Sequence, residues 1–288
     1  MQPPYPRARL RRARRKPAGF DAGIGARKQT GVPPHPHLRL VRLRVRNLRA
    51  CEEFYSTRLG FHVSASRPNH TQLSCASDSP PILELTGDPA AEPSSTDRAG
   101  LFHAALLLPG RAELAGWIRH AADAGVQFEG FADHGVSEAV YLSDPEGNGL
   151  EFYHDRRRSE WPFRAGRLAM TTLPLDVRGL LADESSNKAE PLAGACWGHL
   201  HLSVTNLARS QDFYERELGL TCTQDDYPGA RFLAAGGYHH HVAINVWRRA
   251  RLPWREGAAG IAGAHFSSGE TSTRELRDPD GIPLLVGG

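Results

Sequence analysis

Histidine is the residue type with the most evident chemical potential in this chain, since it occurs fourteen times in 288 residues. Imidazole can ligate a metal ion, and it can accept or donate a proton near neutral pH. Several of these residues are grouped: His199 and His201 alternate in WGHLHLSV, three follow one another at 239–241, and His103 lies in the apolar run LFHAALL. An isolated strand histidine is usually only a hydrogen-bonded polar group. The surrounding elements must therefore show which of them are positioned for chemistry.

The four cysteines offer no second kind of metal site, because they are scattered and form no Cys-x-x-Cys pair. The basic N-terminus is followed by no apolar segment and no small-residue cleavage site. No run of 18 apolar residues occurs anywhere in the chain. These features predict a cytoplasmic protein with reduced thiols and no transmembrane helix.

The net charge of +3 is unevenly distributed along the chain. Residues 1–30 carry nine Lys or Arg side chains and one Asp, so the remainder has a net charge of −5. We interpret residues 1–36 as a disordered basic tail, with binding to nucleic acid or anionic lipid as the alternative. The mildly acidic body excludes a basic nucleic-acid-binding body. We therefore expect neither nucleic acid nor a membrane as a partner.

An internal repeat organises the rest of the chain. LRVRNLRACEEFYSTRLG at 43–60 and LSVTNLARSQDFYERELG at 202–219 share eight identical positions without a gap. Each copy predicts a strand followed by a helix, with the Phe-Tyr pairs at 54–55 and 213–214 in the core. The predicted helix caps are Asn47 and Asn206 before the helix, and Gly60 and Gly219 after it.

Three short strands follow each of these helices, which gives a βαβββ unit of about 50 residues. They are predicted at 61–65, 71–75, 82–85, 220–223, 230–234 and 240–246. A second kind of unit has a strand at 101–108, a helix at 111–124 and the turn DPEGNG at 144–149. DPDG at 278–281 repeats that turn, but too close to its own first strand to leave room for a helix and a strand.

The predicted fold is therefore α+β, with four tandem βαβββ modules of which the last is truncated. The modules span 38–87, 99–154, 197–247 and 258–288. By chain order they form a first domain at 37–155 and a second at 197–288. Residues 156–196 are predicted to be a long surface linker with a short ordered part.

These modules, with one local motif, resemble the vicinal oxygen chelate superfamily, and most of all its type I extradiol dioxygenases of the catechol 2,3-dioxygenase kind. The motif is His134, GVSEA, Val140-Tyr141, LS, DPEG at 144–147, NGL and Glu151. One departure is small: Ala132 stands two residues before His134. The resemblance covers residues 38–288 and leaves the basic tail outside.

In that family, two histidines and a glutamate from a pair of modules bind the metal. Carried over, the resemblance implies His103 and Glu151 from the second module and His199 from the third. Leu40 in the first module and Leu285 in the fourth stand where a ligand would be needed, although His265 is a candidate in the fourth. The resemblance thus implies a metal site between modules two and three, and a cup without metal between modules one and four.

The resemblance also implies Fe(II), or alternatively Mn(II), held by a two-histidine, one-carboxylate triad. It assigns His240 as the acid/base, and His134 and Tyr141 as hydrogen-bond donors to a substrate oxygen. A one-residue slip of the predicted strand would choose His239 or His241 instead. The 239–241 run as a solvated sheet edge is a further alternative. His201 is a rival ligand or a pocket residue.

The resulting hypothesis is an extradiol ring-cleaving dioxygenase that acts on an aromatic diol with O₂, with a homo-oligomer left open. The alternatives are a glyoxalase-type isomerase or lyase, and a non-catalytic protein that binds small molecules. Loops at 69–79 and 225–229 are expected to shape the pocket. The histidines without a partner in this scheme are expected at the surface: His35, His37, His62, His70, His120 and His154.

Overall fold

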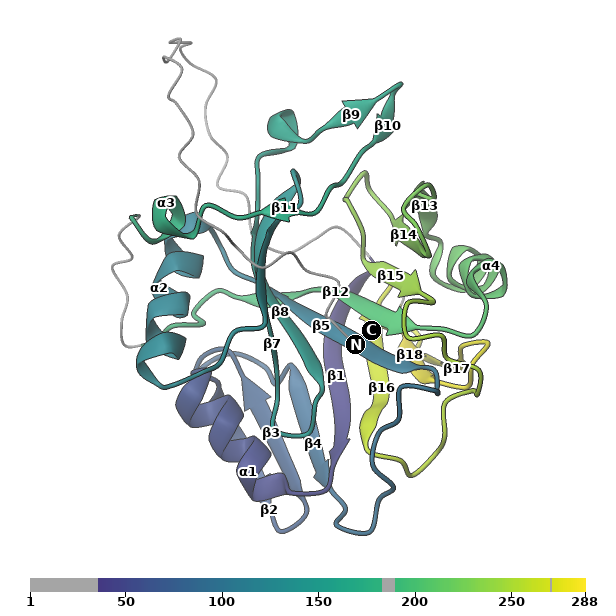
Figure 1. Ribbon diagram of the computed structural model, residues 1–288. Helices are drawn as coiled ribbons and strands as arrows, with labels where there is room; N and C mark the ends of the chain where they lie inside the picture. Colours follow the sequence, from purple (N-terminus) through teal and green to yellow (C-terminus); the bar gives the residue numbers. More distant parts are fainter. Residues whose placement is uncertain (1–35, 183–189, 270) are drawn as a thin grey trace.

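The protein consists of two curved sheets, which the computed structural model describes over residues 36–182, 190–269 and 271–288 (Figure 1). Almost all of the predicted basic tail and His35 lie outside the described residues. All four cysteines are described and are free thiols. No helix in the described ranges is long and apolar enough to cross a membrane.

The first sheet has seven strands in the order β17-β18-β16-β1-β4-β3-β2. Its strands are β1 (His37–Val45), β2 (His62–Arg67), β3 (His70–Ser74), β4 (Leu83–Gly87), β16 (Gly260–Ser267), β17 (Arg274–Arg277) and β18 (Pro283–Val286). All seven come from the first and fourth predicted modules.

The second sheet has nine strands in the order β11-β6-β7-β8-β5-β12-β15-β14-β13. Its strands are β5 (Gly100–Leu107), β6 (Gly130–Asp133), β7 (Ser137–Ser143), β8 (Gly149–Asp155), β11 (Leu173–Pro174), β12 (Cys196–Ser203), β13 (Thr221–Gln224), β14 (Ala230–Ala234) and β15 (Val242–Asn245). All but β11 come from the second and third modules. The cross-pairing of modules inferred from the ligand positions is therefore confirmed.

The α-helices are few and short, and they lie outside the sheets (Figure 1). They are α1 (Leu48–Glu53), α2 (Arg111–Asp123), α3 (Val177–Leu181) and α4 (Leu207–Leu218). A π-helical turn, Phe54–Arg58, continues α1, and a 3₁₀ turn covers Arg158–Glu160. A small separate hairpin pairs β9 (Phe163–Arg164) with β10 (Arg167–Leu168).

The repeat signals identify the helix ends correctly. The Oδ1 atoms of Asn47 and Asn206 accept hydrogen bonds from the backbone N–H groups of the first turns of α1 and α4. Gly219 ends α4 in the left-handed region at φ 64°, where a glycine costs least. The truncation of the fourth module is also confirmed, because no helix lies between β16 and β17 in the described part of that module.

The apolar core extends from one sheet to the other and includes one face of each helix. Tyr55 and Tyr214 are fully buried, as the Phe-Tyr pattern predicts. On the second sheet, Trp117 of α2 stacks on Phe152 of β8 with ring centroids 3.6 Å apart. Because α2 covers that face, the opposite face of β5, β8 and β12 is left for the candidate site.

Candidate active site

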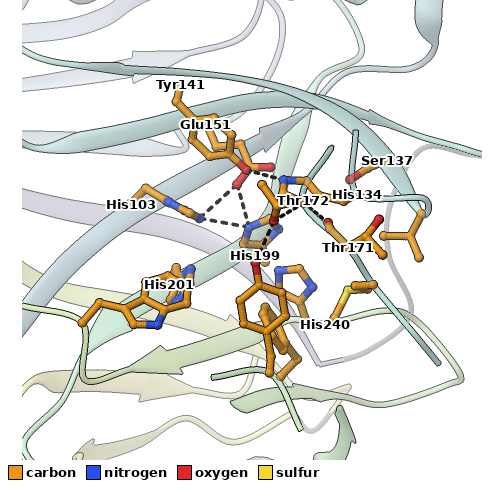
Figure 2. A pocket seen from close by; sticks show the side chains of 15 residues that line it. His103, His134, Ser137, Tyr141, Glu151, Thr171, Thr172, His199, His201 and His240 are labelled. Carbon is orange, nitrogen blue, oxygen red and sulfur yellow. Dashed lines mark hydrogen bonds and ion pairs between the residues drawn. The ribbon is translucent and has the colours of Figure 1, made fainter. Parts of the chain in front are cut away.

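Three donor atoms from three adjacent strands meet on the concave face of the second sheet. Nε2 of His103 lies 3.0 Å from Oε2 of Glu151, and Nε2 of His199 lies 3.2 Å from the same oxygen. The two Nε2 atoms are 3.4 Å apart. Figure 2 shows the three side chains pointing toward one another. All three are buried, with exposed fractions of 5% or less.

Strand register brings these side chains together. Ala105 of β5 lies opposite Glu151 of β8 on one side and opposite His199 of β12 on the other. Since Ala105 has only a methyl group, the larger side chains on either side can converge above it. His103 is two residues away on β5 and so lies on the same face. An irregularity in the β5–β12 pairing between Trp197 and His199 turns the chain just before His199.

The donor set fits a divalent transition metal. Two imidazole nitrogens and one carboxylate oxygen form the facial triad of non-haem Fe(II) oxygenases. Neighbouring ligands about 2.1 Å from an octahedral metal lie about 3 Å apart, which matches the observed triangle. The three atoms all lie within 4.8 Å of one another, and they form the one such group of three among the described residues.

The electrostatics of the triad favour metal binding. Burial acts to raise the pKa of Glu151, but His199 and His103 outweigh it and lower that pKa well below its usual range. Burial lowers the pKa of His199 to about 4, although Glu151 opposes the shift. At neutral pH the carboxylate is therefore ionised and His199 keeps a free lone pair, as metal ligands require.

A second group, His134 and Tyr141, lies beside the triad. Nδ1 of His134 donates to the carbonyl of Thr171 over 2.7 Å, since a carbonyl can only accept. In the neutral ring this leaves Nε2 as an acceptor, and the Tyr141 hydroxyl donates to it over 2.6 Å. Burial lowers the pKa of His134, which favours this neutral form. The pair therefore places a phenol and an imidazole next to Glu151, which is opposite Tyr141 in the sheet.

The 239–241 run differs from its prediction. The three residues lie in a turn before β15 instead of on a strand, so alternation does not govern them. All three are buried, which makes the solvated-edge alternative wrong. His240 lines the cavity, and its ring packs on that of His199 with centroids 4.0 Å apart. Nδ1 of His241 instead accepts from the backbone N–H of Ala235.

The triad forms one wall of a cavity of about 260 Å³. The apolar and aromatic part of its lining consists of Val136, Met170, Tyr227, Phe232 and Trp247, and Thr171 and Thr172 also line the cavity. Glu151 is the single carboxylate among the lining residues, and none of them is Lys or Arg. The cavity thus combines an apolar, aromatic lining with the polar triad.

Part of that lining comes from the segment predicted to be a surface linker. Met170, Thr171 and Thr172 lie at its middle, just before β11, which adds to the edge of the sheet by pairing with β6. The Thr172 and Tyr227 hydroxyls, both in the lining, are 2.8 Å apart. Of the two predicted pocket loops, 225–229 contributes Tyr227, whereas 69–79 lies in the other sheet and contributes no lining residue.

His201 is a pocket residue and lies outside the donor triangle. The amide of Asn245 donates to its Nε2 over 2.9 Å, which occupies that lone pair. Its ring meets that of His103 edge-on, with centroids 4.7 Å apart. His265 is also absent from the triangle: its Nε2 donates to the carbonyl of Gly287 in the first sheet. The register places His265 opposite Leu285, in the place of Ala105 and not of His103.

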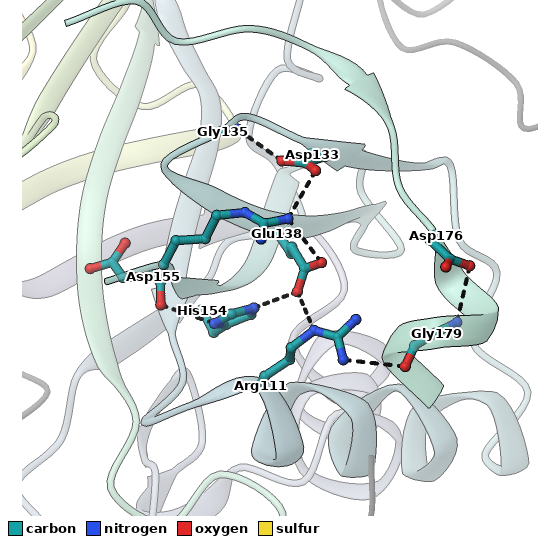
Figure 3. A network of polar contacts seen from close by, with 9 residues as sticks. Arg111, Asp133, Gly135, Glu138, His154, Asp155, Asp176 and Gly179 are labelled. Carbon is teal, nitrogen blue, oxygen red and sulfur yellow. Dashed lines mark hydrogen bonds and ion pairs between the residues drawn. The ribbon is translucent and has the colours of Figure 1, made fainter. Parts of the chain in front are cut away.

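His154 corrects another prediction, because it is buried and not at the surface. Its Nε2 lies 2.7 Å from Oε2 of Glu138 in a charged network on the opposite face of the sheet (Figure 3). Arg111 of α2 and Arg156 bind the same carboxylate. Burial acts to raise the pKa of Glu138, but the hydrogen bonds and charges of His154 and Arg111 outweigh it and lower that pKa to about 2. This network fastens α2 to β7 and β8 behind the site.

The comparisons with known proteins agree with the fold and with the motif. The model of the Glyoxalase/Bleomycin resistance protein/Dioxygenase superfamily matches residues 36–152. A Bacillus subtilis protein named catechol-2,3-dioxygenase is 37% identical over 232 residues, which cover 78% of this chain and 79% of that protein. The chain belongs to the Glyoxalase/Bleomycin resistance protein/Dioxygenase superfamily.

Solved structures share the fold at much lower sequence identity. Glyoxalase I from Zea mays matches with a TM-score of 0.51 at 15% identity, over 87% of this chain and 91% of that one. The cppA protein from Streptococcus pneumoniae matches with a TM-score of 0.54 at 11% identity, over 88% of this chain and 98% of that one. At these identities the likeness concerns the fold alone.

Proposed function

We propose that this protein is an extradiol dioxygenase that inserts O₂ next to the diol of a catechol-type aromatic. In this proposal His103, His199 and Glu151 hold Fe(II), and Mn(II) could satisfy the same donors. The observation that carries it is the facial triad in the lining of a cavity that also contains several apolar and aromatic side chains. The name of the 37% identical relative, catechol-2,3-dioxygenase, supports the same activity.

When bound, the iron would supply coordination positions for the diol and O₂ and the redox coupling between them. The chain supplies the rest. The three ligands come from adjacent strands of one sheet, so the side facing the cavity stays free for the reactants. The apolar lining, with Phe232 and Trp247, would hold the aromatic ring and exclude water.

In this proposal, His240, Tyr141 and His134 transfer protons and donate hydrogen bonds around the aromatic ring of the substrate. His240 lies against His199, and its low pKa, caused mainly by burial, leaves it neutral and able to accept a proton from a substrate hydroxyl. The Tyr141 hydroxyl now donates to Nε2 of His134, and a substrate oxygen in the cavity would compete for that same hydrogen. These two residues would thus orient the substrate oxygen that they contact.

The test is anaerobic reconstitution of the full chain with Fe(II), followed by catechol and air. We expect a yellow ring-fission product and the uptake of one O₂ per catechol. Zn(II) loading is the matched control, since zinc suits the same ligands but has no redox chemistry. A protein that binds one iron per chain and leaves catechol intact would overturn the proposal.

The same experiment separates the two alternatives. A glyoxalase-type enzyme would bind metal and isomerise a thiol adduct of a dicarbonyl compound without consuming O₂. A non-catalytic binder would retain aromatic compounds with no metal requirement. Among the residues lining the cavity there is one carboxylate, Glu151, beside the set His134, Tyr141 and His240. That composition favours the dioxygenase, because proton transfer during ring cleavage needs such neutral donors and acceptors.

A further inference from the structure

A chain of three side chains runs from the end of β8 to the cavity. Oδ1 of Asp155 lies 2.9 Å from Nε2 of His239, and Nδ1 of His239 lies 2.7 Å from Nδ1 of His240. His239 is fully buried, whereas the Asp155 side chain is one-quarter exposed. Trp161 packs edge-on against His239, with ring centroids 5.4 Å apart. The cavity and the carboxyl end of β8 are thereby linked through two imidazoles.

The hydrogen bonds determine where the protons lie. An ionised carboxylate only accepts, so Nε2 of His239 carries a hydrogen and donates it to Asp155. In the neutral His239 ring, Nδ1 is then bare and accepts. Because His240 faces it with its own Nδ1, that atom of His240 must carry the hydrogen. Nε2 of His240 is left with a lone pair, and no hydrogen-bond partner for it occurs among the described residues.

We propose that Asp155 and His239 are positioning residues that hold His240 in the tautomer with hydrogen on Nδ1, so that Nε2 offers its lone pair to the cavity. This inference rests on the acid/base role given to His240 in the proposed function. In that step the substrate O–H bond breaks and an N–H bond forms at Nε2, with no further reactant. His239 then accepts a stronger hydrogen bond from the charged ring, and Asp155 stabilises it in turn.

A purely structural role for these three hydrogen-bonded side chains would have a counterpart in the same sheet. Glu138 also holds a buried histidine, His154, over 2.7 Å. Nδ1 of His154, however, donates to the backbone carbonyl of Asp155, so both ring nitrogens are occupied. His154 does not line the cavity that contains the triad. The Asp155–His239–His240 series differs because His240 lines the candidate site and the one hydrogen bond of its ring within the described residues is made by Nδ1.

The first measurement is the tautomer of His240. Nitrogen-15 NMR of the full chain with labelled histidine, metal-free and loaded with diamagnetic Zn(II), reports which ring nitrogen carries the hydrogen. We expect hydrogen on Nδ1 of His240 in the unaltered protein. In Asp155→Asn the amide NH₂ can donate to Nε2 of His239 instead. This reverses the direction of both hydrogen bonds, so that Nδ1 of His239 donates to Nδ1 of His240 and the His240 hydrogen moves to Nε2. Hydrogen on Nε2 in the unaltered protein would overturn the inference.

The second measurement is turnover of catechol by the iron-loaded variants. A wrong tautomer set by an Asp→Asn change costs about 10⁴-fold in kcat in serine proteases. We expect Asp155→Asn to lose at least about 10²-fold in kcat, with KM and iron content unchanged. Asp155→Glu, which keeps the carboxylate, should restore part of the loss. Asp88→Asn is the matched control, since Asp88 is a similarly exposed ion-pair partner of Arg44 in the other sheet.

The two proposals fail in different ways. If the iron-loaded protein leaves catechol intact, the proposed function fails, while the NMR tautomer still shows whether Asp155 and His239 position His240. If catechol is cleaved and Asp155→Asn changes neither the tautomer nor kcat, the positioning inference fails and the proposed function stands.

Discussion

The β5–β12 pair and the β1–β16 pair occupy equivalent places in the two sheets, but different side chains stand at the matched positions. Where the second sheet has His199 and Glu151 on either side of Ala105, the first sheet has Leu40 and Leu285 on either side of His265. The strand pairing is the same in both sheets. The first strands of the two modules pair antiparallel (β1 with β16, β5 with β12), and within a module the first and last strands pair parallel (β16 with β18, β5 with β8). This arrangement of paired strands can therefore exist without a metal-binding triad.

The remaining matched pair strengthens this comparison. His103 lies opposite His201 in the second sheet, whereas Gly263 lies opposite Arg42 in the first. Arg42 is held by Glu84 over 2.8 Å, and Gln72 donates to the other oxygen of that carboxylate. The first sheet thus uses its face for an ion pair and amide contacts. The difference between the two sheets shows that the candidate metal site depends on three side chains, those of His103, His199 and Glu151, and on the small residue Ala105 between them.

The largest effect should come from removing the carboxylate. We expect Glu151→Ala to lose iron and to lower catechol turnover by at least about 10³-fold, because two imidazoles alone bind the metal weakly. Leu285→Ala, at the matched position of the first sheet, should keep both. Iron per chain and O₂ uptake measure the two outcomes. A Glu151→Ala protein with full iron and full activity would refute the triad.

The next effect separates metal binding from proton transfer. His240→Phe should keep the iron, since the ring is outside the triad, and lose about 10²- to 10⁴-fold in kcat with the acid/base. His265→Phe in the first sheet should leave kcat unchanged, because that ring binds a backbone carbonyl. Turnover of His240→Phe at the wild-type rate would move the acid/base role to another residue.

A third effect concerns stability and not catalysis. Glu138 has a pKa of about 2 in the fold, below its ordinary value, so its network stabilises the protein above about pH 4.5 and is lost as the pH falls toward 2. We expect Glu138→Gln to lower the free energy of unfolding by about 2 kcal/mol at neutral pH, since its arginine partners are partly solvated.

The first sheet supplies the control for that measurement. Glu84→Gln breaks the more exposed pair with Arg42 and should cost less than about 1 kcal/mol. Urea unfolding at pH 7 and at pH 3 would measure both variants. Equal losses, or a Glu138→Gln effect that is unchanged at pH 3, would show that the buried network carries no extra stability.

The sequence could predict whatever depends on local pattern. The Asn caps, the glycine ends and the truncated fourth module follow from short repeated segments. The positions of His103, His199 and Glu151 follow from the family motif and from strand alternation, and their cross-pairing from the absence of donors at Leu40 and Leu285. Each of these signals lies within a few residues of the feature that it predicts.

What could not be predicted depends on contacts between distant segments. Met170 reaches the cavity because a two-residue strand, β11, adds to the edge of β6, and so short a strand leaves no periodic signal. Asp155 meets His239 across 84 residues, and no spacing rule connects them. His154 is buried because α2 brings Arg111 to the carboxylate of Glu138 beside it. A single strand histidine gives no sign of such a partner.

A buried tyrosine contact in each half of the chain tests the repeat itself. Tyr55 of the first module donates to Asp144 of the second, and Tyr214 of the third donates to Asp278 of the fourth, each over 3.1 Å. We expect Tyr55→Phe and Tyr214→Phe each to cost about 1 to 2 kcal/mol, because each removes a donor from a buried carboxyl group. Urea unfolding of the two variants at neutral pH measures the costs, and equal values would make the two contacts true equivalents.

The pH dependence can distinguish them further. Burial, with the Asp280 charge, raises the pKa of Asp278 to about 6, so this carboxyl group ionises in the fold only above that pH. An ionised carboxylate needs the Tyr214 hydrogen bond more than a neutral carboxyl group does. The cost of Tyr214→Phe should therefore be larger at pH 7.5 than at pH 5. A cost that is the same at both values would mean that Asp278 does not change its charge between them.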